Sequence, residues 1–172
     1  MKKNIVLVGF MGSGKTSVGK RLSMALKAEF IDMDDFIEKR EKMTVTQIFA
    51  EKGEPYFRGL EKELCVRFAT GGGKVIATGG GVVKDSVNVK NLKEGGVIFY
   101  LKSSPEKIAE NLKDDHSRPL LETGDKADKI REMMREREHF YTRCCDVTID
   151  AANKDPDSMA AEILSYIKET EK

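Results

Sequence analysis

The sequence has few cysteines and no long hydrophobic stretch. Its three cysteines, Cys65, Cys144 and Cys145, have neither the number nor the spacing of a disulfide framework or a structural zinc site, so a reducing, cytoplasmic compartment is expected. No segment reaches the roughly 20 apolar residues that a membrane-spanning helix needs. The apolar run at 5–11 ends in a glycine-rich stretch without a signal-peptide cleavage site. Neither a membrane partner nor secretion is therefore expected.

The chain also lacks an excess of charge of either sign. Lysine and arginine number 30 against 29 acidic residues, a formal charge of +1. Such a chain has no overall basic field to hold nucleic acid, so an anionic ligand must be bound by a local group of residues. The 172 residues correspond to about one domain, and 40% apolar residues supply a core. We expect one domain spanning 1–172 that acts as a monomer.

Strand and helix patterns alternate along the chain. Helical spacing fills most segments between short apolar runs, and strands are predicted at 5–8, 30–32, 75–78, 97–101 and 147–149. This alternation predicts right-handed crossovers. The expected fold class is therefore α/β, with three layers: a five-stranded parallel sheet and helices on both faces. The polar, aperiodic segment 113–124 is predicted to be a long functional loop.

A phosphate-binding loop is predicted between the first strand and the first helix. The run Gly9-Phe10-Met11-Gly12-Ser13-Gly14-Lys15-Thr16 matches G-x-x-x-x-G-K-S/T. Its glycines let backbone N–H groups surround phosphate oxygens, and the helix N-terminus adds positive potential. Lys15 supplies a charge, and the Thr16 hydroxyl can ligate Mg²⁺. We therefore predict nucleoside triphosphate binding rather than a simple glycine-rich turn.

Three carboxylates, Asp32, Asp34 and Asp35, follow the second predicted strand, at the sheet edge where the phosphate-binding loop opens. If the strand-like conformation continues, Asp32 and Asp34 point to the same side. Mg²⁺ at one carboxylate and a substrate hydroxyl at the other would satisfy both groups. The alternative is that these acids only stabilise a helix N-terminus, which suits Asp35 best.

Two glycine triplets receive different interpretations. The triplet at 79–81 follows a predicted central strand, so its backbone can approach a ligand closely. The triplet at 71–73 follows a helix, and a helix end with a flexible loop is predicted there.

Further motifs occur at Gly53-Glu54-x-x-Phe57-Arg58-x-x-Glu61, Val75-Ile76-Ala77-Thr78-Gly79-Gly80-Gly81, Arg118-Pro119-Leu120-Leu121 and Arg137-x-x-x-Tyr141. Together with the phosphate-binding loop and the D-x-D at 32–34, they resemble the shikimate kinase family in order and spacing over nearly the whole chain. The loop alone is common to many nucleotide-binding proteins, whereas the combination is specific. The resemblance implies ATP-dependent phosphorylation of the 3-hydroxyl of shikimate in aromatic amino-acid biosynthesis, with Mg²⁺ as cofactor.

The resemblance also implies roles for individual residues. It implies catalysis by Lys15, Asp34 and Arg118, and a metal site at Thr16 and Asp32. Nucleotide binding is implied for Gly12, Ser13, Gly14, Lys15, Thr16, Ser17, Arg118 and Pro156. Shikimate binding is implied for Asp34, Arg58, Gly79, Gly80, Gly81 and Arg137. A helical region at about 33–62 would hold shikimate, and a mobile lid at about 113–124 would carry Arg118.

Both arginines assigned to shikimate have alternatives. A guanidinium fork suits a carboxylate better than lysine does. Arg58 could instead pair with Glu54 or Glu61 on its own helix. Arg137 lies in a dense charged run at 131–139, where most side chains are expected to be solvated.

The chain departs from the family at Asn111, where an arginine commonly stacks on adenine. We expect adenine to meet Pro156 on its other face, unless Lys113 reaches the base. Two other functions stay open: a kinase for another polyol acid such as gluconate, and a regulatory ATP-binding module without catalysis. The first shares the loop but not the whole set of motifs, and the second would not be expected to keep Lys15, Asp34 and Arg118 together.

Overall fold

The computed structural model describes residues 3–115, 121 and 125–170. Five parallel strands form one sheet in the order β2-β3-β1-β4-β5. Their bounds are β1 (Asn4–Val8), β2 (Glu29–Asp32), β3 (Lys74–Ala77), β4 (Gly96–Lys102) and β5 (Val147–Asp150). The predicted α/β class with a five-stranded parallel sheet is confirmed.

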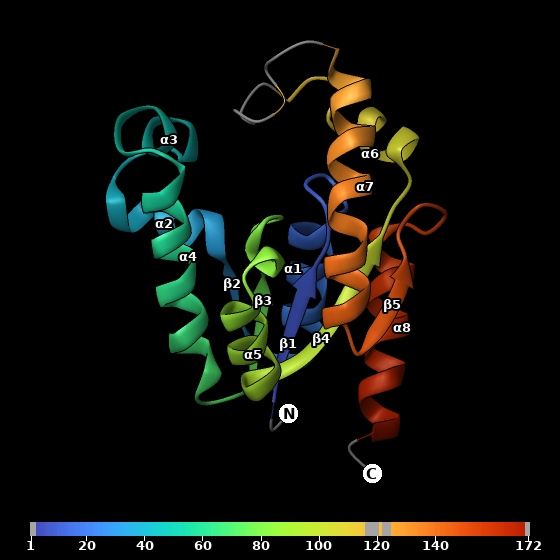
Figure 1. The fold of residues 1–172 in the computed structure, drawn as a ribbon. Helices are drawn as coiled ribbons and strands as arrows, with labels where there is room; N and C mark the ends of the chain where they lie inside the picture. Colours follow the sequence, from blue (N-terminus) through green and yellow to red (C-terminus); the bar gives the residue numbers. More distant parts are fainter. Residues whose placement is uncertain (1–2, 116–120, 122–124, 171–172) are drawn as a thin grey trace.

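Helices cover both faces of the sheet (Figure 1). One face carries α1 (Lys15–Leu26) and α8 (Pro156–Thr170), which pack on Ile5 and Leu7 of β1. The opposite face meets Val6 and Val8, because successive side chains of a strand point to opposite sides. Its helices include α4 (Glu54–Ala69), α5 (Ser86–Gly95) and α7 (Lys126–Cys144). Shorter elements are α2 (Met33–Glu41), α3 (Val45–Lys52), the 3₁₀ turn η1 (Val82–Lys84) and α6 (Pro105–Asn111).

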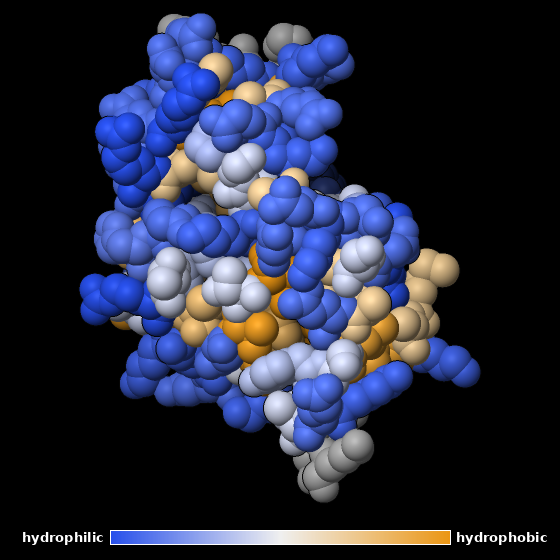
Figure 2. Space-filling model, turned by 90° about the vertical axis from the view of Figure 1, so that its right-hand side faces the viewer, coloured by the Kyte–Doolittle hydropathy of each residue, from blue (hydrophilic) through white to orange (hydrophobic). Residues whose placement is uncertain are grey.

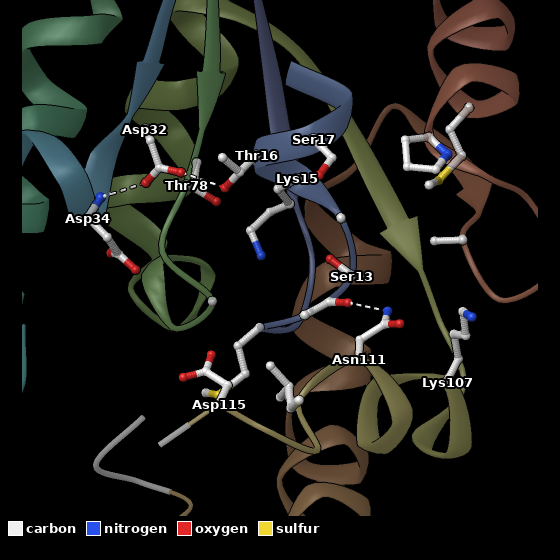
Figure 3. Close-up of a pocket in the computed structure, with 18 of the residues that line it drawn as sticks. Ser13, Lys15, Thr16, Ser17, Asp32, Asp34, Thr78, Lys107, Asn111 and Asp115 are labelled. Carbon is white, nitrogen blue, oxygen red and sulfur yellow. Dashed lines mark hydrogen bonds between the residues drawn. The ribbon is translucent and has the colours of Figure 1, made fainter. Parts of the chain in front are cut away.

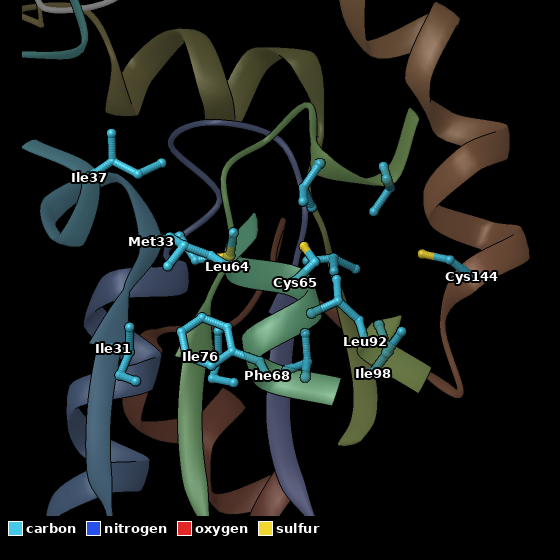
Figure 4. Close-up of a cluster of buried hydrophobic side chains, with 14 of the residues drawn as sticks. Ile31, Met33, Ile37, Leu64, Cys65, Phe68, Ile76, Leu92, Ile98 and Cys144 are labelled. Atoms are coloured by element: carbon cyan, nitrogen blue, oxygen red, sulfur yellow. The ribbon is translucent and has the colours of Figure 1, made fainter. Parts of the chain in front are cut away.

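The core under α4 contains two of the cysteines. Leu64 and Phe68 of α4 pack over strand residues of the sheet, and Cys65 and Cys144 lie in the same cluster (Figure 4). Burial raises the pKa of both thiols to about 12. They are therefore protonated packing groups at neutral pH, because the effect of burial is larger than that of any neighbouring charge.

The surface seen in Figure 2 is mainly hydrophilic, and hydrophobic residues emerge on it as separate patches. Within the described residues, no helix is both long and apolar enough to cross a membrane. A third hydrophobic cluster joins α6 to α7 and includes Phe10, Leu112 and Leu121. The other residues of the predicted lid from 116 onward, Arg118 among them, lie outside the described residues.

Candidate functional site

The phosphate-binding loop joins β1 to α1 and depends on left-handed glycines. Gly12 has φ +77° and Gly14 has φ +94°, a region that other residues rarely adopt. A Cβ at Gly12 would also lie 2.9 Å from Cγ of Leu112. Gly14 precedes the first turn of α1, whose backbone N–H groups lack partners within the helix. The loop therefore presents positive potential where a phosphate can bind.

Lys15 lies at the centre of this loop and is buried. Its ammonium donates to the carbonyl oxygens of Gly9 at 2.8 Å and Phe10 at 2.9 Å. In Figure 3 the side chain extends into the cavity beside the loop. Lys15 therefore holds the loop together as well as placing a positive charge in it.

Thr16 and Asp32 face one another across the start of α1 and the end of β2. Thr16 Oγ1 donates to Asp32 Oδ2 at 2.6 Å (Figure 3). Hydroxyl and carboxylate oxygens suit Mg²⁺, which usually keeps several waters and phosphate oxygens as further ligands. The described residues contain no group of three or more His, Cys, Asp or Glu side chains that could hold a metal by themselves. The pair thus fits a Mg²⁺ ion that arrives with a nucleotide.

The predicted strand end at Asp32 is confirmed, but the strand-like geometry that would place Asp32 and Asp34 on the same side does not extend to Asp34. β2 ends at Asp32, and Asp34 lies in the first turn of α2. The physical reason is that Asp32 Oδ1 accepts the N–H groups of Asp34 at 3.1 Å and Asp35 at 3.4 Å, which caps the helix. Asp32 thus does stabilise a helix N-terminus, in addition to its contact with Thr16.

A cavity of about 1100 Å³ opens over the phosphate-binding loop, and both Asp32 and Asp34 line it. Many residues singled out from the sequence share its wall: Gly12, Ser13, Gly14, Lys15, Thr16, Ser17, Gly80 and Pro156. One cavity wall therefore contains a phosphate site, carboxylates and part of the glycine turn after β3.

Charged side chains from three helices surround that glycine turn (residues 79–81). A Cβ on its first glycine would collide with Glu61 and lie 3.2 Å from Asp34 Oδ1. A Cβ on the second would lie 3.7 Å from Arg137 Nη1, and one on the third 2.6 Å from Arg58 Nη1. The structure therefore brings these residues together around one turn, although of the turn and the two arginines only the middle glycine lines the cavity.

Arg58 makes the pairs along its own helix that were considered as the alternative. Its Nη1 donates to Glu61 Oε2 at 2.6 Å, and its Nε and Nη2 donate to Glu54 Oε1 at 3.2 and 2.9 Å. These bonds use three of the five N–H donors of a guanidinium. The pairing therefore orients Arg58 against the glycine turn and still leaves donors for a ligand.

The alternative considered for Arg137, that it is solvated like most of the charged run at 131–139, is wrong, because its exposed fraction is only 5%. Arg137 lies on the buried face of α7, which also carries Ile130, Met133 and Tyr141. Its guanidinium stacks near the ring of Phe10, 5.6 Å from the centroid. Within the described residues it makes no salt bridge with a carboxylate. A buried cation in this situation favours an anionic ligand.

Glu61 is the functional candidate that the sequence interpretation left without a role. It is fully buried, and burial raises its pKa to about 7, with a further contribution from the Asp34 charge against the opposing effect of Arg58. Its Oε1 has no hydrogen-bond partner in the described part of the chain. The sequence feature that could have pointed to Glu61 is its spacing, because it lies one helical turn after Arg58 in the quoted motif.

The far end of the cavity carries Lys107, Asn111 and Pro156. The Asn111 amide donates to the Gly12 carbonyl oxygen at 2.8 Å (Figure 3). The residue that departs from the family pattern therefore braces the phosphate-binding loop. Pro156 is the first residue of α8.

A parallel α/β sheet with a phosphate-binding loop and a charged turn beside it defines a small-molecule kinase class. The model of the shikimate kinase family matches residues 11–168, and the chain belongs to that family. A shikimate kinase from Caldanaerobacter subterraneus subsp. tengcongensis is 47% identical over 96% of this chain and 97% of its own.

Solved structures extend the comparison. A shikimate kinase from Acinetobacter baumannii in complex with shikimate aligns with a TM-score of 0.94 and 33% identity, covering 99% of this chain and 95% of that one. A gluconokinase from Sinorhizobium meliloti aligns with a TM-score of 0.58 and 16% identity, covering 98% and 93%. The latter likeness concerns the fold alone.

Proposed function

We propose that this chain phosphorylates the 3-hydroxyl of shikimate with ATP, giving shikimate 3-phosphate and ADP. The observation that carries the proposal is the glycine turn at 79–81, which abuts the phosphate-binding loop and has arginines on two sides. A Cβ at Gly80 would lie 3.4 Å from the Met11 nitrogen and 3.7 Å from Arg137 Nη1. A small rigid acid held there has its hydroxyl beside a bound triphosphate.

The nucleotide half consists of the phosphate-binding loop, with Pro156 against the adenine. Lys15 holds charge on the phosphate oxygens, and Thr16 with Asp32 would hold Mg²⁺. When bound, Mg²⁺ neutralises charge on the β- and γ-phosphates. Phosphoryl transfer depends mainly on such positioning and charge stabilisation, so the loop needs no nucleophile of its own.

The acceptor half consists of the helical region at about 33–62 together with α7. Arg58 and Arg137 bind the shikimate carboxylate, which places the 3-hydroxyl at Asp34. Asp34 accepts the hydroxyl proton as the oxygen attacks the γ-phosphorus and the bond to ADP breaks. The burial of Arg137, which makes no salt bridge within the described residues, supports this assignment, because a carboxylate would compensate its charge.

We propose that residues 113–124 form a lid whose Arg118 meets the transferring phosphoryl group. Arg118→Ala should lower kcat by at least about 10²-fold while shikimate binding, measured by calorimetry, changes little. Loss of binding at unchanged kcat would instead make Arg118 a ground-state anchor.

We also propose that the protein is a monomer and lies in the cytoplasm. The location is supported by the free thiols at all three cysteines, which fit a reducing compartment.

A coupled ADP-release assay tests the function directly. We expect turnover with shikimate and none above background with gluconate. Turnover with gluconate alone would favour the other polyol-acid kinase, and nucleotide binding without turnover on either acid would favour a regulatory module. Lys15→Ala serves as the inactive control.

A further inference from the structure

Tyr141 is a buried residue of α7 that touches the glycine turn but has no role in the function proposed above. Its hydroxyl donates to the carbonyl oxygen of Gly80 at 2.5 Å. Its ring stacks on Tyr100 of β4, with centroids 5.0 Å apart and an interplanar angle of 19°. The residue is 1% exposed. Its hydroxyl therefore has a fixed direction, set by the sheet on one side and the turn on the other.

The hydroxyl stays a donor over the physiological pH range. Burial raises the pKa of Tyr141 to about 12, against the opposing charge of Arg137. Tyr141 also lies one helical turn after Arg137, on the same buried face of α7. One helix therefore carries both the guanidinium and the hydroxyl that meet Gly80.

Fixing the Gly80 carbonyl has a consequence for the next residue. The peptide between Gly80 and Gly81 is planar and trans, so the N–H of Gly81 must point away from the side where Tyr141 binds. Glycine at both positions gives this peptide little intrinsic orientation. A Cβ on Gly81 would meet the Arg58 guanidinium. The orientation of this one peptide thus sets how the turn faces both arginines.

We propose that Tyr141 is a positioning residue for the acceptor, which orients the Gly80–Gly81 peptide between Arg58 and Arg137 so that shikimate binds. This inference rests on the proposed function. It assigns Tyr141 no contact with ATP, because the hydroxyl faces the glycine turn and Tyr141 does not line the cavity over the phosphate-binding loop.

The chain offers a matched control in Tyr100. Its hydroxyl donates to Glu138 Oε2 at 2.6 Å, and its ring belongs to the same stack. Tyr141→Phe and Tyr100→Phe each remove one buried hydroxyl and keep both rings. Only the first change frees the Gly80 carbonyl.

Steady-state kinetics of both variants, with their melting temperatures, provide the test. We expect Tyr141→Phe to raise KM for shikimate about 5- to 10-fold, the effect of one hydrogen bond, and to leave KM for ATP within about twofold. Tyr100→Phe should leave both values unchanged. Equal shifts for both substrates, the same shift in Tyr100→Phe, or no shift would overturn the proposal.

A second measurement separates positioning from a general loss of packing. In ¹⁵N-glycine-labelled protein, the amide resonance of Gly81 should move in Tyr141→Phe and stay in place in Tyr100→Phe. An unmoved Gly81 resonance would overturn the proposal. Wild-type protein that does not phosphorylate shikimate would remove the proposed function itself, whereas active wild type with unaltered Tyr141→Phe would remove only this inference.

Discussion

The two halves of the site are built in opposite ways. The nucleotide half is largely main chain: a single run of eight residues turns through left-handed glycines and ends in a helix N-terminus. The acceptor half consists of side chains from α2, α4 and α7, which meet around a glycine turn that follows β3. In the proposed function, the first would bind a group that every nucleotide shares, and the second would bind one small acid.

The halves also differ in electrostatics. Lys15 in the nucleotide half bonds to main-chain carbonyls. In the acceptor half, burial raises the pKa of Glu61 to about 7, with the charge of Asp34 acting in the same direction and Arg58 against it. A site made of opposed buried charges responds to pH and to each member of the cluster.

Removing charge from the nucleotide half should have the largest effect. We expect Lys15→Ala to lower kcat by at least about 10³-fold, because the charge on the transferring group is lost. The variant should stay folded, with a free energy of unfolding lowered by no more than about 3 kcal/mol for the lost bonds to the loop. Lys20→Ala, an exposed lysine of the same helix, is the control. Unchanged turnover in Lys15→Ala would remove the phosphate-site assignment.

The titration of the acceptor half comes next. Because the pKa of Glu61 is raised from 4.5 to about 7, its proton stabilises the folded state fully below pH 4.5, and this stabilisation is lost as the pH rises to about 7. Glu61→Gln cannot titrate. The difference in free energy of unfolding, Glu61→Gln minus wild type, should therefore rise by on the order of 3 kcal/mol as the pH is raised from about 4 to 8. Urea denaturation across this range measures the gain, and a constant difference would contradict it.

Arg58→Lys keeps the positive charge in the acceptor half but removes the planar guanidinium, which can donate two parallel hydrogen bonds to a carboxylate. We expect KM for shikimate to rise about 10- to 100-fold, corresponding to roughly 1.5–3 kcal/mol, with KM for ATP unchanged. Arg40→Lys is the matched control, since Arg40 forks onto Glu63 at 2.8 and 3.0 Å on the surface. Equal effects on both substrates would argue that Arg58 supports the fold rather than the acid.

The smallest effect concerns the base. A guanidinium stacked over adenine contributes about 0.5–2 kcal/mol to binding. Asn111→Arg should therefore raise the affinity for ATP roughly two- to thirtyfold more than it raises the affinity for tripolyphosphate. Wild-type protein should accept GTP with appreciable activity, because the loop contacts are common to all nucleotides. Calorimetry with the three ligands measures these differences.

Asn111→Ala separates stacking from the contact of Asn111 with the loop. It removes the bond to Gly12, so it should weaken ATP and tripolyphosphate alike. If Asn111→Arg leaves ATP affinity unchanged while Lys113→Ala weakens it, the stack comes from Lys113 and the interpretation of Asn111 fails.

The same contrast explains what the sequence could predict. The loop, its helix and the strand alternation are local features, so their positions and the sheet followed from spacing. Asp34 was located from its place after the second strand, whereas the two arginines were located by resemblance, because no local pattern says that residues 58 and 137 meet it.

Three features could not be predicted in this way. The cap by Asp32, whose side chain accepts two N–H groups, begins α2 directly after β2, so Asp34 does not share a side of a strand with Asp32. The burial of Arg137 follows the helical spacing it shares with Met133 and Tyr141, which the density of charges concealed. The contact of Asn111 with Gly12 joins positions 99 residues apart and depends on the fold.

Asp32 also limits how such an enzyme can be redesigned. One of its oxygens faces Thr16, and the other holds the start of the helix that carries Asp34. An engineer who replaces this carboxylate to change metal preference therefore also loosens the acceptor half. Changes in α7 have a similar link, because Arg137 lies against Phe10 of the phosphate-binding loop. Redesign toward new acceptor acids is therefore better begun in α4, which carries Arg58.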